Sequence, residues 1–174
     1  MRRSELTGLC WEHVDLDASR VRVVETLQRL TGQGLAVGQP KTARSRRSIS
    51  LSPEAIKLLE SVRDYQTAQR LLMGDGWTDT GYVFTRPDER PVIPDELSQD
   101  FQRIVRKTGL PPLTLHGLRH AHATILLSAG VHAKVVSERL GHSNIAVTMD
   151  THSHVLPSLQ EAAANTLDEY LATG

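Results

Sequence analysis

The chain has 174 residues, 39% of them hydrophobic, and its 20 basic and 20 acidic residues cancel to a formal net charge of zero. This length and composition are typical of one compact soluble domain. They exclude a membrane-spanning protein, since no apolar run approaches the roughly 20 residues that a spanning helix needs. The N-terminus has no apolar stretch of the kind found in secretion signals, so we expect a cytoplasmic protein. The single cysteine, Cys10, cannot form an internal disulfide, and we expect it to be a small buried residue.

Zero net charge argues against a nucleic-acid partner, but the basic residues are unevenly distributed. No Lys or Arg follows Arg139, and acidic residues occupy the final segment. Local basic patches can bind phosphate even when the total charge is neutral. The candidate DNA-binding residues form two clusters: Lys41, Arg44, Arg46 and Arg47, and then Arg103, Arg106 and Lys107. The alternative is that these clusters are only the solvated faces of a hairpin and a helix.

The N-terminal third predicts a short helix followed by a small antiparallel sheet. Residues 3–9 resemble a helix, and residues 21–27 alternate as a strand does. A glycine-rich turn at 31–34 separates this strand from two further strands, at 35–39 and 47–51. The basic loop around Lys41 would connect these last two strands.

The remaining pattern is mostly helical. Ser52 and Pro53 are a good helix start, and apolar spacing carries this helix to about Met73. A short strand is predicted at 82–84, and Pro94 begins a helix with one apolar stripe. Helices are then predicted at 116–129, 132–140, 145–151 and 157–171. The fold class is therefore α+β and mainly helical, with a small antiparallel β-sheet packed on a helical bundle in a single domain over 1–174.

Several residues have the chemistry of a phosphate site. His116 and Arg119 are three residues apart and so share one face at a helix start, where donors and the helix dipole favour anions. Arg2 and Glu5 have the same spacing, Lys41 begins the basic loop, and His142 lies at a helix junction. Taken singly, each has an ordinary alternative as a cap, a surface charge or a turn residue.

The ordered combination resembles the tyrosine-recombinase (phage-integrase) family. The matching motifs are Arg-x-x-Glu-Leu at 2–6, a hairpin lysine at Lys41, His-x-x-Arg at 116–119 and Leu-Gly-His at 140–142. Intervening segments are also similar, among them 11–15, 120–124, 135–139 and 153–157. The resemblance covers nearly the whole chain and implies the catalytic domain of such an enzyme.

The resemblance implies a metal-free, cofactor-free transfer of a DNA phosphodiester onto a tyrosine, with double-stranded DNA as the partner. Arg2 and Arg119 would clamp the scissile phosphate, and His116 and His142 would donate hydrogen bonds to it. Lys41 would protonate the departing 5′ oxygen, and Glu5 would orient the site. Fixed cations of this kind stabilise the negative charge that develops during transfer.

This sequence departs from the family at the nucleophile. Counting on from His142, the position of the family's tyrosine is residue 152, which is His152. The three tyrosines, Tyr65, Tyr82 and Tyr170, lie in other segments. Attack by an imidazole would give a labile phosphoramidate, so we expect impaired or absent cleavage. Because Arg2 stands at the very start, we also expect a domain truncated at its N-terminus, without the family's core-binding domain.

Two alternatives stay open. The chain could be a catalytically inactive DNA-binding or accessory remnant of an integrase, which needs only the phosphate clamp. It could also be a metallohydrolase that uses His116 and His120 with His122, His152 and His154, although the general-base glutamate of His-Glu-x-x-His is absent. The helix predicted at 157–171 has an apolar face suited to docking on its own or a neighbouring subunit, and so to a homo-oligomer.

Overall fold

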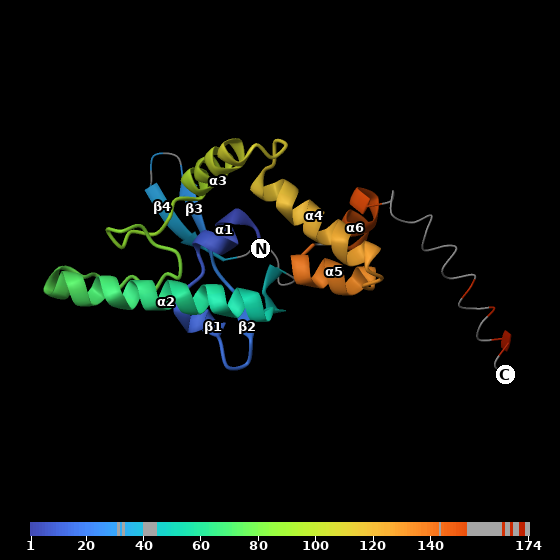
Figure 1. Ribbon diagram of the computed structural model, residues 1–174, viewed down its shortest axis with the longest axis horizontal. Coiled ribbons are helices and arrows are strands. Elements are labelled where there is room, and N and C mark those ends of the chain that lie inside the picture. Colours follow the sequence, from blue (N-terminus) through green and yellow to red (C-terminus); the bar gives the residue numbers. More distant parts are fainter. Residues whose placement is uncertain are drawn as a thin grey trace.

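A computed structural model describes residues 1–30, 32, 34–39, 45–142 and 144–152, together with the isolated positions 165, 168, 171 and 172. The strands lie with α1 (Arg3–Thr7), α2 (Pro53–Met73) and α3 (Pro94–Thr108) at one end of the molecule. Helices α4 (Leu115–Ser128), α5 (Ala133–Leu140) and α6 (Ile145–His152) gather at the other end (Figure 1). The predicted mainly helical α+β fold is confirmed. Among the described helices, none has both the length and the apolar character of a membrane span.

The strands form two small antiparallel sheets, whereas the sequence predicted one. Strands β1 (Val14–Asp15), β2 (Arg20–Val23) and β5 (Arg47–Ser50) form the first sheet, in the order β1-β2-β5. Strands β3 (Thr26–Leu30) and β4 (Gly34–Gly38) form the second. The single strand predicted at 21–27 is wrong, because the chain leaves the first sheet after Val23 and enters the second at Thr26.

Each end of the molecule has its own apolar cluster. The first contains buried residues of the β1-β2-β5 sheet, α2 and the loops: Leu9, Val21, Val23, Ile49, Leu59 and Val83. The second joins α4 to α5 through Ala123, Leu127, Val136 and Leu140. Burial of apolar area in each cluster stabilises its own elements. The residues that link the clusters therefore decide how α1 and β5 lie relative to α5.

Most helix ends follow the expected capping rules. The Ser52 side chain accepts a hydrogen bond from the Ala55 N–H at 3.3 Å at the start of α2, and Pro53 occupies its first turn. The Thr114 side chain caps α4 in the same way, accepting from Gly117 N–H at 2.9 Å. At the end of α5, Gly141 adopts a left-handed conformation with φ of 67°.

Helix α1 ends at Thr7, two residues before the predicted end. The chain leaves the helix because Gly8 packs against the β3 backbone and the Leu9 carbonyl accepts a hydrogen bond from Val83 N–H at 2.8 Å. The predicted strand at 82–84 is only an isolated bridge between Cys10 and Tyr82. Cys10 is half-buried, and burial together with the charges of Glu25 and Glu12 raises the pKa of its thiol to about 11.

We predict that Gly8→Ala destabilises the fold. A Cβ atom at residue 8 would lie 2.7 Å from the Leu27 nitrogen and 2.9 Å from the Thr26 carbonyl carbon, and backbone atoms cannot move aside easily. The free energy of unfolding in urea should fall by about 2 kcal/mol. Gly76→Ala is the matched control, because nothing lies within 4 Å of a Cβ there. Equal stability of the two variants would contradict the close packing of α1 on β3.

Candidate functional site

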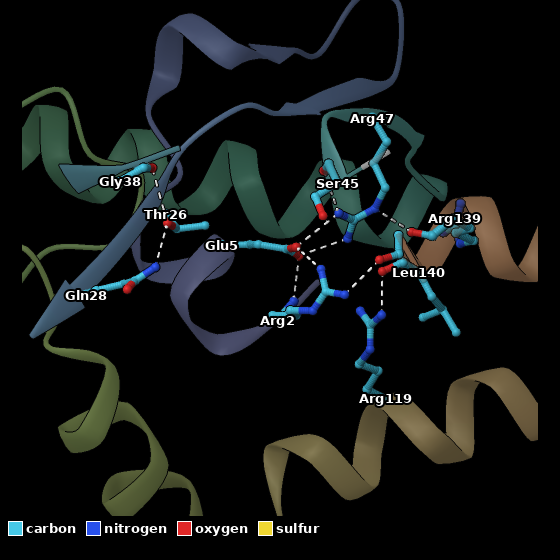
Figure 2. Close-up of polar contacts among 11 residues, drawn as sticks. Arg2, Glu5, Thr26, Gln28, Gly38, Ser45, Arg47, Arg119, Arg139 and Leu140 are labelled. Atoms are coloured by element: carbon cyan, nitrogen blue, oxygen red, sulfur yellow. Dashed lines mark hydrogen bonds and ion pairs between the residues drawn. The ribbon is translucent and has the colours of Figure 1, made fainter. Parts of the chain in front are cut away.

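Three arginine side chains meet at the C-terminal end of α5 (Figure 2). Arg47 Nε donates to the Arg139 carbonyl at 2.8 Å, and Arg2 Nη2 donates to the Gly141 carbonyl at 2.7 Å. Arg119 Nη2 donates to the carbonyl between them, that of Leu140. The last carbonyls of a helix have no intrahelical partner and carry the negative end of the helix dipole. This end of α5 is therefore a suitable acceptor for guanidinium groups.

Glu5 lies buried among these arginines, with its side chain only 1% exposed. Arg47 binds both carboxylate oxygens, with Nη1 to Oε1 at 3.0 Å and Nη2 to Oε2 at 2.8 Å. Arg2 also donates twice, from its backbone N–H to Oε2 at 2.7 Å and from Nη1 to Oε1 at 2.8 Å. Glu5 is in the first turn of α1, so the backbone bond also caps that helix.

These contacts decide the protonation of Glu5. Burial alone would raise the pKa of the carboxyl, but the hydrogen bonds and charge of Arg47, and the bonds from Arg2, lower it from 4.5 to about 2. Glu5 is thus a carboxylate throughout the physiological range. We refer to Arg2, Glu5, Arg47 and Arg119 as the arginine cluster; its three guanidinium groups and one carboxylate leave two uncompensated positive charges.

Arg119 is the member of the arginine cluster with an unused buried donor. Its Nη1 is inaccessible to solvent and has no hydrogen-bond partner among the residues that the structure describes. Burial, and then repulsion from Arg2 and Arg47, lower the pKa of its guanidinium to about 10. A buried donor of a cation without an acceptor costs free energy, and an anionic oxygen would remove that cost.

His142 follows immediately after the three carbonyls. Its Nδ1 lies 2.8 Å from the Thr148 hydroxyl, and the Thr148 side chain is fully buried on α6. This bond fixes the plane of the imidazole beside the arginine cluster. His116 is exposed in the first turn of α4, with its Nε2 2.6 Å from His120 Nε2. One of these two rings therefore donates to the other.

The structure brings together four of the predicted site residues, Arg2, Glu5, Arg119 and His142, around the end of α5. His116 lies one turn before Arg119 on α4. Lys41 and Arg44 lie outside the described residues. His152 ends α6, and its side chain also lies outside the described part of the chain.

The predicted DNA-binding residues have different environments. Arg46 is exposed and donates to the Gln39 side chain. Arg103, Arg106 and Lys107 are exposed on the C-terminal half of α3, where Arg103 pairs with Asp100 at 3.1 Å. Placing Arg47 in this set needs correction. Its side chain is 6% exposed and its donors are used by Glu5 and backbone carbonyls, so it is not one of the exposed cations of this set.

Sequence reasoning missed three parts of the site: the carbonyls at the end of α5, the internal role of Arg47, and Thr148. Backbone carbonyls leave no signal in a side-chain pattern. The burial of Arg47 did have a signal in the sequence, because two residues along a strand from Arg47 is Ile49, which is buried on the same face.

A groove of about 720 Å³ between β5 and α5 extends from this site. Among its charged lining residues the basic ones outnumber the acidic one, Glu138, and they are Arg46, Arg47, Lys134 and Arg139. The exposed Lys134 is a further candidate phosphate contact. Another cavity, of about 870 Å³, lies beside α2 and contains none of the predicted site residues. The described residues include no group of three His, Cys, Asp or Glu side chains that could hold a metal ion. The side chains of His152 and His154 lie outside that search.

The comparison with known families gives one match over most of the chain. The sequence profile of the phage integrase family matches residues 1–157. A XerC-like tyrosine recombinase of Caldanaerobacter subterraneus is 31% identical over 97% of this chain and 46% of its own length. The ICEBs1 integrase of Bacillus subtilis is 30% identical over 98% of this chain and 46% of its own length.

Solved structures agree with the sequence match. The Tn1549 transposon integrase in complex with transposon right end DNA is similar with a TM-score of 0.79 and 28% identity, covering 99% of this chain and 55% of that one. The XerA recombinase gives a TM-score of 0.69 at 25% identity, and the match covers 93% of this chain and 53% of that one. The chain thus spans about half the length of these relatives.

We predict that Glu5→Gln destabilises the chain in a pH-dependent way. The pKa of Glu5 is lowered by folding, so its stabilisation is present above the unfolded value and is lost as the pH falls from about 5 to about 2. The substitution leaves Arg47 buried without its carboxylate and should cost about 3 kcal/mol at pH 7. Urea unfolding across this pH range should show the gap between parent and variant closing towards pH 2.

The control is Glu60→Gln, at an exposed position on α2. This variant should follow the parent at every pH. A gap for Glu5→Gln that stays constant with pH would contradict the assignment of the carboxylate to the ion pair.

Proposed function

The chain belongs to the phage integrase family of tyrosine recombinases, and from this we propose that it is a catalytic domain for site-specific DNA recombination and integration. The observation that carries the proposal is the arginine cluster, which has a net charge of +2 and in which Nη1 of Arg119 has no hydrogen-bond partner among the described residues. A DNA phosphate has the charge and the acceptor oxygens that would complete this arrangement. The match to an integrase whose structure contains transposon end DNA supports double-stranded DNA as the partner.

The proposed reaction is a metal-free phosphoryl transfer. A nucleophile bonds to the scissile phosphorus while the bond from phosphorus to the 5′ oxygen breaks, and the 5′ oxygen takes a proton from Lys41. Arg2 and Arg119 bind the nonbridging oxygens, and His142 and His116 donate further hydrogen bonds. Because their partners already hold these groups in place, little reorganisation is needed when negative charge develops.

Position 152 decides how far this reaction goes. It lies at the end of α6, which packs against α5 and α4. Histidine there would form a labile phosphoramidate in place of a stable phosphotyrosine. This residue favours a second function, in which the chain binds DNA as an accessory protein with little or no cleavage. We further propose a bacterial cytoplasmic location and a homo-oligomer formed through residues 157–171.

We predict metal-independent duplex DNA binding that weakens steeply with salt, since bound cations displace condensed counterions. Arg119→Ala should weaken binding of a random-sequence duplex about tenfold and reduce the salt slope by about one. Fluorescence anisotropy at several salt concentrations, with and without a chelator, measures both quantities. The exposed Arg63→Ala on α2 is the charge-matched control and should change neither. Binding that requires zinc, or that is insensitive to salt, would refute the proposed phosphate site.

We also predict that His152→Tyr gives the chain covalent chemistry. The phenol supplies a nucleophile with a stable phosphoester product, and the arginine cluster already supplies charge stabilisation. A library of nicked duplexes of randomised sequence should yield a protease-sensitive 3′ adduct, seen as a gel shift. The adduct should disappear when Arg119→Ala is added. Equal cleavage by the parent chain would mean that residue 152 is not a lost nucleophile.

A further inference from the structure

We infer that Arg47 is a positioning residue, which holds Arg2 and Arg119 in the geometry that grips a phosphate without touching the DNA itself. This inference rests on the proposed function, because it concerns how the same site is assembled. Its first support is burial. The Arg47 side chain is 6% exposed, and four of its N–H groups donate within the protein: to both oxygens of Glu5, to the Ser45 carbonyl and to the Arg139 carbonyl.

The second support is connectivity. Arg47 and Ile49 are on β5, and Ile49 belongs to the apolar cluster around the first sheet, whereas Leu140 at the end of α5 belongs to the other cluster. The bond from Arg47 to Arg139 crosses between them, and Arg139 returns a bond from its Nη1 to the Ser50 carbonyl at 2.9 Å. Arg47 is therefore one of the residues that set where the end of α5 lies relative to α1, together with Arg2 and Arg139.

The placement of Arg2 and Arg119 depends on where the end of α5 lies. Arg2 is held by Glu5 and by the Gly141 carbonyl, and Arg119 is held by the Leu140 carbonyl. Arg47 binds Glu5 and the carbonyl just before these two, so a shift of its guanidinium would move the acceptors of both clamp residues. Arg47 also takes part of the charge of Glu5, which would otherwise be balanced by Arg2 alone.

Gly141 shows how closely the guanidinium is packed. A Cβ atom at residue 141 would lie 2.7 Å from Arg47 Nη1 and 2.9 Å from its Cζ. The positive φ of 67° already favours glycine, and the contact adds a second requirement. Gly141→Ala should therefore displace Arg47 and reproduce the effect of replacing Arg47.

The test is a set of duplex-binding measurements with Arg47→Lys, which keeps the charge but cannot bind two carboxylate oxygens and two carbonyls at once. In the parent background this variant should weaken binding of a random-sequence duplex about tenfold. In an Arg2→Ala, Arg119→Ala background it should change binding less than twofold, because its effect passes through those residues. The neighbouring Arg46→Ala should weaken binding by the same factor in both backgrounds.

A second readout needs no DNA. The Nε–Hε signals of Arg2 and Arg119 in nitrogen-15 NMR spectra should shift in Arg47→Lys, and the Arg119 signal should also shift in Gly141→Ala. The melting temperature records whether each variant folds. Unchanged signals in a folded Arg47→Lys would overturn the inference, as would an equal loss of binding in both backgrounds. A parent chain that binds no duplex would refute the proposed function, whereas shifted signals would still support positioning by Arg47.

Discussion

The buried carboxylate of Glu5 is the constraint on which the rest of the site depends. A lone carboxylate is far too costly to keep away from water, and only the bidentate contact with Arg47 and the two bonds from Arg2 make its burial tolerable. These partners come from the N-cap of α1 and from β5, and the same two arginines reach across to the end of α5. Satisfying one charge therefore fixes three elements relative to one another.

The arrangement is stable but incomplete. Like charges are held close together at the end of α5, and the lowered pKa of Arg119 reflects its burial and this repulsion. A protein optimised only for stability would not keep a buried guanidinium donor that, among the described residues, has no acceptor. The repulsion between the guanidinium groups and the buried Nη1 of Arg119 both lower the stability of the chain. A bound anion would reduce both costs, so the same contacts that lower stability favour phosphate binding.

The sequence predicted well those features that depend on local side-chain and backbone chemistry. Ser52, Pro53 and Gly141 mark helix ends through local hydrogen bonding and backbone conformation, and those ends were found close to their predicted positions. The division into β2 and β3 was missed because strand alternation gives no sign of which partner a strand takes. Arg47 was placed with its exposed neighbours because its charge dominated the interpretation, although its register with Ile49 indicated burial. The carbonyl acceptors could be recognised only from the fold.

The use of consecutive carbonyls at one helix end restricts how α5 can change. Residues along an α-helix are separated by roughly 100° around its axis, so the carbonyls of the last turn face different sides of the helix. Arginines on β5, on α4 and at the N-cap of α1 each reach one of them. An exposed position such as Glu138 is free to vary in chemistry. Inserting or deleting a single residue in the last turn, by contrast, would rotate every acceptor away from its arginine, so the length of this helix is less tolerant of change than its composition.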